Sequence, residues 1–98
     1  MINWLSISGF QWDQGNAFKS ETKHCVTKEE AEQMFANEPL IVTSDTAHSS
    51  SEDRFHALGP TDSGRMLHAS FTVRGPLIRP ISVRPMNRKE RMIYEKAN

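Results

Sequence analysis

Residues 67–84 read LHASFTVRGPLIRPISVR, and this stretch predicts the centre of the fold. Its first eight residues alternate between apolar and polar side chains, which is the two-residue period of a strand buried on one face. The apolar residues are Leu67, Ala69, Phe71 and Val73. An Arg-Gly-Pro turn signal at residues 74–76 then predicts a second strand over residues 77–84, antiparallel to the first.

Pro80 lies inside the second of these strands. Because proline has no N–H group to donate to a neighbouring strand, it predicts either a sheet edge or a bulge at this position. On strict two-residue alternation, Arg79 and Arg84 point to opposite faces of the sheet. We therefore expect at most one of these two arginines to contact a given ligand directly.

Two helices are expected before the strands. Asp13 predicts the N-cap of a helix that ends near His24. Thr27 and Glu30 form a capping box, in which each side chain accepts a hydrogen bond from the backbone of the other residue. The helix that they begin should end near residue 37.

Shorter strands and a last helix complete the expected fold. The strands lie over residues 7–12, 40–43 and 53–58, the last of them ending at a Gly-Pro turn signal. Asn87 and Glu90 predict the cap of a helix that runs to about residue 96. Two N-terminal helices packed on an antiparallel meander, followed by a C-terminal helix, indicate a single α+β domain over residues 1–98.

Aromatic side chains must supply much of the core in a chain of 98 residues. Those expected inside are Trp4, Phe10, Trp12, Phe18, Phe35, Phe55 and Phe71. The single cysteine, Cys25, excludes an internal disulfide and fits a reducing compartment. No apolar run approaches the ~20 residues of a membrane span, and no signal peptide is evident, so we expect a cytoplasmic protein.

Charge is divided unevenly along the chain. Residues 1–62 hold 4 Lys and Arg against 10 Asp and Glu, whereas residues 63–98 hold 8 against 2, so the net charges are −6 and +6. Six of the eight late cations are arginines, whose planar guanidinium matches phosphate oxygens. This division favours either a surface for a polyanion or acidic protein, or mutual neutralisation of the two halves across the fold.

Motif-defined enzyme classes find little support. The four histidines share no metal-ligand spacing, and no glycine-rich phosphate loop or nucleophile elbow is present, so we expect neither a metal nor a cofactor. The remaining candidates for a functional role are arginines within apolar strands. Arg54 and Arg79 must extend their charged ends to solvent, line a cleft or pair with a carboxylate such as Glu52 or Asp53 inside the sheet.

Several segments together resemble successive signatures of one family, the BrnT ribonuclease toxins of bacterial type II toxin–antitoxin systems. They are FQWD at 10–13, KH at 23–24 before Val26, HS at 48–49 with EDR at 52–54, GR at 64–65, IRPISVR at 78–84, NRKER at 87–91 and YE at 94–95. The resemblance covers residues 10–95. It implies a RelE-like fold, cleavage of RNA and neutralisation by a cognate BrnA-type antitoxin, a ribbon-helix-helix protein that alone would contact operator DNA.

The chain departs from the family pattern at four positions. It has Asn16, Ser20, Cys25 and Pro80 where the family often has Lys, Asn, Gly and an aliphatic residue. A glycine after a helix usually takes the left-handed conformation, which is more costly for a cysteine.

A ribonuclease of this kind would use the substrate's own 2′-hydroxyl as nucleophile, and it needs proton-transfer groups and cations around the phosphorus. The candidates for proton transfer are Lys23 and His24, with His48 or His56 as alternatives that the sequence does not separate. The candidates for charge stabilisation are Arg54, Arg65, Arg79 and Arg84, and those for RNA binding are Arg88, Arg91 and Tyr94. Dependence on the ribosome stays open. The alternative function is a catalytically silent module that binds nucleic acid or the antitoxin.

Overall fold

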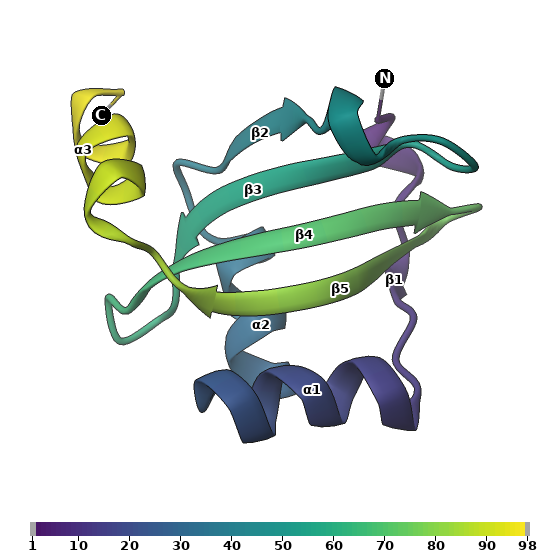
Figure 1. The fold of residues 1–98 in the computed structure, drawn as a ribbon, viewed down its shortest axis with the longest axis horizontal. Helices are drawn as coiled ribbons and strands as arrows, with labels where there is room; N and C mark the ends of the chain where they lie inside the picture. The colour runs from purple at the N-terminus through teal and green to yellow at the C-terminus, as the bar shows by residue number, and fades with distance from the viewer. Residues whose placement is uncertain (1, 98) are drawn as a thin grey trace.

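A computed structural model describes residues 2–97, apart from the side chain of Phe18. The elements follow in the order η1 (Trp4–Ser6), β1 (Gly9–Phe10), α1 (Gln14–His24), α2 (Lys28–Ala36), β2 (Ile41–Ser44), η2 (Thr46–His48), β3 (Arg54–Pro60), β4 (Met66–Arg74), β5 (Leu77–Pro85) and α3 (Arg88–Lys96). Strands β2 to β5 form an antiparallel meander, and β1 pairs parallel to β5 at the far edge (Figure 1). The predicted α+β fold is confirmed. No helix in the described part of the chain is long and apolar enough to cross a bilayer.

The helices begin at the predicted residues. Asp13, Thr27 and Asn87 are the N-caps, and each forms a reciprocal capping box with the residue three positions later. These caps satisfy backbone N–H groups that the first turn of a helix leaves free. Local sequence therefore determines where the helices start.

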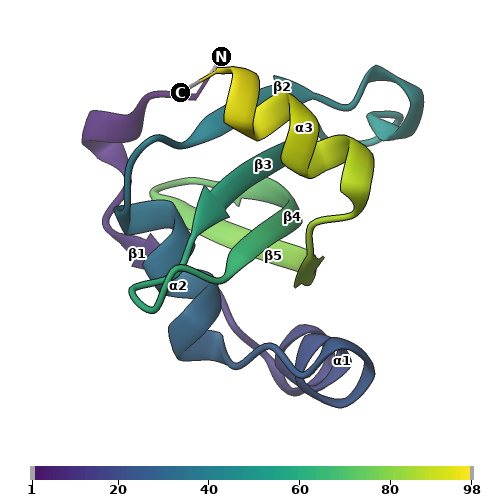
Figure 2. The ribbon, with the colours of Figure 1, turned by 90° about the vertical axis from the view of Figure 1, so that its left-hand side faces the viewer.

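The helices lie on both sides of the sheet (Figure 2). Helices α1 and α2 cover the face that carries the main core, whose buried members are Val26, Ala31, Met34, Ala57, Leu67, Ala69, Phe71, Ile78 and Val83. Helix α3 packs on the opposite face, where Tyr94 and Met86 contact Leu58. The two faces of the sheet are therefore covered unequally: α1 and α2 cover one face, and α3 covers the other only at one end.

Phe71 is the centre of the aromatic core. Its ring is fully buried and lies 5.0 Å from the ring of Phe35 and 5.5 Å from that of Phe55, between centroids. Phe10, Trp12, Phe35 and Phe55 are partly buried around it, in agreement with the prediction. The prediction for Trp4 is wrong, because Trp4 is 41 % exposed. The side chain of Phe18 lies outside what the structure describes.

Strand β3 is longer than predicted. It continues through the expected turn residues to Pro60, which pairs with Met66 of β4. A Cβ atom on Gly59 would lie 2.8 Å from the carbonyl oxygen of Met34. Gly59 therefore permits the close approach of α2 to the sheet, and the chain reverses only after Pro60.

Strand β5 contains the bulge that Pro80 predicts. Ser70 pairs with Ser82 and Phe71 pairs with Pro80, so Ile81 has no partner on β4. An unpaired residue reverses the alternation of side chains beyond it. This shift alters which residues of β5 share a face.

The bulge places Arg79 and Arg84 on the same face of the sheet. Arg79 lies opposite Thr72, and Arg84 lies opposite His68, and these two residues of β4 point away from α1 and α2. Directly paired residues share a face, so both arginines point the same way. The expectation that they point to opposite faces is wrong, because it assumed an unbroken two-residue period.

Helix α1 completes the edge of β5 beyond the short strand β1. The side-chain amide of Asn16 donates to the carbonyl oxygen of Pro80 at 2.8 Å, and the N–H of Val83 donates to the hydroxyl of Ser20 at 2.9 Å. Both α1 side chains are buried. Asn16 and Pro80, two departures from the family pattern, are thus bonded to each other around the bulge.

Cys25 at the end of α1 has a φ of 54°, the left-handed conformation that glycine adopts without cost. We expect Cys25→Gly to raise the free energy of unfolding by about 0.5–1 kcal/mol, because it removes the clash of Cβ at positive φ. Chemical denaturation measures the change. Cys25→Ala, which keeps the Cβ, is the matched control, and an equal gain from both substitutions would contradict the explanation.

Candidate active site

The sheet face opposite α1 and α2 carries polar side chains in rows that cross the strands. The first row is Arg54, Thr72 and Arg79; the second is Thr43, His56, Ser70 and Ser82; the third is Ile41, Leu58, His68 and Arg84. Facing residues in neighbouring strands lie about 4.5–5.5 Å apart at Cβ. Imidazole and hydroxyl groups of the middle row therefore lie between two rows that contain arginines.

A cleft of about 400 Å³ opens over the second and third rows, where α3 crosses the sheet. His56 and Ser70 line its sheet side, and Glu90 and Ile93 of α3 line its other side. This volume is within the range of about 300–1,000 Å³ that is typical of ligand pockets.

Asp45 and two histidines form a chain of contacts beside this cleft. A carboxylate oxygen of Asp45 lies 3.0 Å from Nε2 of His56, and Nδ1 of His56 lies 3.0 Å from Nε2 of His68. Asp45 also contacts Nδ1 of His48 at 3.1 Å. Since the side chain of His56 is 36 % exposed, the middle imidazole is within reach of a substrate.

The surroundings of these groups determine their charge. Burial raises the pKa of Asp45, but hydrogen bonding and charge from His48 and the charge of His56 outweigh burial and hold that pKa below its usual range. Burial, followed by the charge of Arg84, lowers the pKa of His68 to about 4. At neutral pH this chain of contacts therefore begins at an ionised carboxylate, Asp45, and ends at an uncharged imidazole, His68.

Glu90 holds the guanidinium of Arg84 at the third row. Two N–H groups of Arg84 donate to the Glu90 carboxylate at 2.7 and 2.8 Å, and one Glu90 oxygen lies 3.9 Å from Nε2 of His68. Hydrogen bonds from Arg84 lower the pKa of Glu90 to about 2. Arg79 is similarly bound, to Asp13 at 2.6 Å.

Arg54 differs from these two arginines. It forms no ion pair among the residues that the structure describes, and its buried Nε has no hydrogen-bond partner there. The buried hydroxyl of Thr72, its neighbour in the first row, is also unpartnered. Within residues 2–97 there is no ion pair between Arg54 or Arg79 and Glu52 or Asp53, the expected alternative; Glu52 pairs with Arg74, and Arg79 pairs with Asp13.

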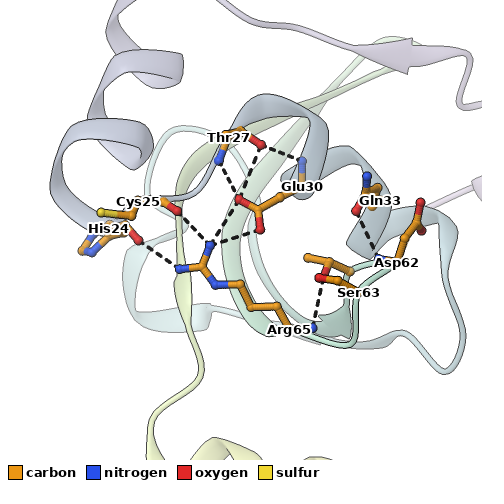
Figure 3. A network of polar contacts seen from close by, with 9 residues as sticks. His24, Cys25, Thr27, Glu30, Gln33, Asp62, Ser63 and Arg65 are labelled. Atoms are coloured by element: carbon orange, nitrogen blue, oxygen red, sulfur yellow. Dashed lines mark hydrogen bonds and ion pairs between the residues drawn. The ribbon is translucent and has the colours of Figure 1, made fainter.

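Arg65 lies in a separate network, where α1 meets α2 (Figure 3). It donates to the carbonyl oxygens of His24 and Cys25 and to the carboxylate of Glu30, the partner of Thr27 in the capping box of α2. Lys23 and His24 lie in the last turn of α1 and make none of the contacts of the histidine chain. The structure thus separates these three candidates from the arginines of the sheet face.

The three RNA-binding candidates lie on α3, but they differ in exposure. Arg88 and Arg91 are exposed. Tyr94 is only 2 % exposed, and its hydroxyl donates to the carbonyl oxygen of Pro39 at 2.6 Å. Tyr94 therefore anchors α3 to the sheet and presents no ring face on which a base can stack.

One family comparison matches most of the chain. The model for "Ribonuclease toxin, BrnT, of type II toxin-antitoxin system" matches residues 12–90. The chain belongs to the BrnT family. It is accordingly a ribonuclease toxin, with an RNA substrate and a cognate antitoxin. No curated protein matches the sequence.

Sequence reasoning missed several members of this candidate site. Asp45, His68 and Glu90 were not candidates, and His56 was only an alternative. A signal was present, since a hairpin that turns at residues 61–64 pairs His56 with Ser70, two residues from His68, and so brings both imidazoles to one face in adjacent rows. Within residues 2–97, no three His, Cys, Asp or Glu side chains are placed to hold a metal ion.

Burial of His68 should make the stability of this BrnT toxin depend on pH. The unfolded chain takes up this proton near pH 6.5 and the folded chain only near 4, so stability is full above 6.5 and falls as the pH falls toward 4. The loss is up to roughly 3 kcal/mol. Thermal melts of wild type and His68→Gln between pH 7 and 5, above the range where carboxylates titrate, measure it. An equal slope in both proteins would contradict this assignment.

Proposed function

We propose that this BrnT toxin cleaves RNA without a metal ion, by attack of the substrate's 2′-hydroxyl on the adjacent phosphorus. The observation that supports the proposal best is the chain of contacts from Asp45 through His56 to His68, in which His56 lies between two rows that contain arginines. The scissile phosphate would lie over the middle row. The site of action would be the bacterial cytoplasm.

His56 is the proposed general base. When His56 is neutral, the ionised Asp45 orients the proton onto Nε2, and Nδ1 then has a free lone pair. In the resting protein His68 contacts this lone pair, with Ser70 3.4 Å away. A bound substrate would replace His68 there and give its 2′-hydroxyl proton to Nδ1. The 2′-oxygen then bonds to phosphorus, and the bond to the 5′-oxygen breaks.

The arginines of the same face would stabilise the charge of the transition state. Preorganised cations contribute most where negative charge develops during the reaction. Arg54 is the first candidate, because it forms no ion pair among the residues that the structure describes. Arg79 and Arg84 would add to it from β5. The departing 5′-oxygen would take a proton from water, which leaves a 2′,3′-cyclic phosphate and a 5′-hydroxyl.

The proposed partner is a BrnA-type antitoxin of the ribbon-helix-helix class. An acidic segment of such a protein would block activity if it occupied the arginines of the sheet face. Association would then be steered by charge and weaken as salt rises. Operator DNA would be bound by the antitoxin, and Arg88 and Arg91 of this chain would extend the surface for RNA.

The first test of the proposal is cleavage in the presence of EDTA. Purified protein should cut RNA at an unchanged rate and leave cyclic phosphate or 3′-phosphate ends, because the proposed groups need no metal. Gel analysis and end-group mass spectrometry measure both. Activity that is lost in EDTA and restored by Mg²⁺ would overturn the mechanism, and binding of RNA without cleavage would favour the silent module.

The second test separates the histidine chain from the end of α1. We expect His56→Ala and Asp45→Asn to lower kcat by about 100-fold or more, which is the usual contribution of a general base. His24→Ala should retain activity, since His24 lies apart from the sheet face. The difference in kcat is measured by steady-state kinetics on variants whose melting temperatures equal that of the wild type. If only His24→Ala lost activity, the general base would be His24 on α1, and the proposal would be wrong.

A further inference from the structure

A second cavity, of about 670 Å³, adjoins the proposed cleft. It lies where the N-terminal segment meets the end of β2 and the start of β3. Thr43 of the middle row lines both cavities, and Arg54 of the first row lines the second one. The two cavities are therefore neighbours, and Arg54, which forms no ion pair within residues 2–97, lies beside the larger of them.

The walls of this cavity combine an exposed aromatic ring with hydroxyl groups. Trp4, Val42 and Phe55 form its apolar part, and the side chains of Thr43 and Thr46 supply hydroxyls. Trp4 is 41 % exposed, and its ring lies 6.4 Å from that of Phe71 between centroids, at an angle of 46°. An aromatic residue that contacts the core, lines the cavity and is partly exposed can offer a surface for stacking.

We propose that this cavity binds one base of the RNA substrate, next to the scissile phosphate. Sites for single-stranded nucleic acid pair an aromatic stacking surface with cations that hold the backbone. Trp4 would supply the stacking surface, and Arg54 would hold the phosphate that joins this nucleotide to the one in the cleft. The inference rests on the proposed ribonuclease function and adds a specificity site to it.

A base fits these walls better than an apolar side chain of the antitoxin. The hydroxyls of Thr43 and Thr46 match the polar edge of a base, whereas an aliphatic side chain would leave them without partners. Continuity with the histidine cleft through Thr43 also favours a ligand that extends into both cavities. A single strand of RNA has this form.

Fluorescence of Trp4 provides a direct test. Trp4 and Trp12 are the two tryptophans of the chain, so Trp12→Phe isolates the signal of Trp4. The probe is a short single-stranded RNA with methylated 2′-hydroxyls, which binds but lacks the nucleophile. We expect it to quench Trp4, and we expect Thr46→Phe, which fills the cavity, to weaken binding about tenfold.

Leu5→Ala is the matched control, because Leu5 is 99 % exposed and does not line the cavity. It should bind the probe as wild type does. In cleavage assays Trp4→Ala should lose sequence preference at one position beside the cut, and Leu5→Ala should keep it. Thr46→Phe retains Trp4 and its contact with Phe71, so the test does not depend on how well Trp4→Ala folds.

The outcomes separate this site from the catalytic proposal. Wild-type cleavage without quenching, and with full binding by Thr46→Phe, would overturn the base site while the ribonuclease function stands. Quenching with loss of affinity in Thr46→Phe, but no cleavage of natural RNA, would support the base site and overturn the catalytic proposal. Quenching by the antitoxin and not by RNA would assign the cavity to the protein partner instead.

Discussion

Strand β5 contains one residue more than β4 can pair with, and Ile81 is that residue. Before this bulge Ile78 and Pro80 point into the core, and after it Val83 does so. The polar residues between them switch faces at the same point, so Arg79 and Arg84 both lie on the face opposite α1 and α2. Without the bulge, one of these arginines would face the hydrophobic core, and the rows of the candidate site would not exist.

Helix α1 supports the outer edge of this irregular strand. Beyond Ile78, β5 has no partner on β1, and buried backbone groups without partners are costly. Asn16 and Ser20 bind the carbonyl of Pro80 and the N–H of Val83 from the outer side. The edge of the sheet is therefore closed by side chains of a helix where β1 has ended.

The unequal charge of the two halves of the chain serves mainly to join them. Arg65, Arg74 and Arg79 of the basic half pair with Glu30, Glu52 and Asp13 of the acidic half. Mutual neutralisation thus accounts for much of the pattern. Arg54, which belongs to the acidic half, is the sheet-face arginine that lacks such a partner in the described structure, and total charge gives no indication of it.

The sequence by itself determined the helix starts, the central pair of strands and the family. These depend on short-range patterns: capping boxes over four residues, alternation over eight, and ordered motifs such as IRPISVR. The sequence also indicated that Pro80 causes a bulge or an edge. It did not indicate which, and only the pairing with β4 shows how far the register moves.

The tertiary structure alone decided the candidate site. Asp45, His56, His68 and Glu90 come from four different segments, and their contacts depend on strand register and on the position of α3. It also decided that Arg65 binds the junction of α1 and α2, and that Tyr94 is buried. The physical reason is that register and packing are set by the whole sheet, whereas sequence patterns report only local periodicity.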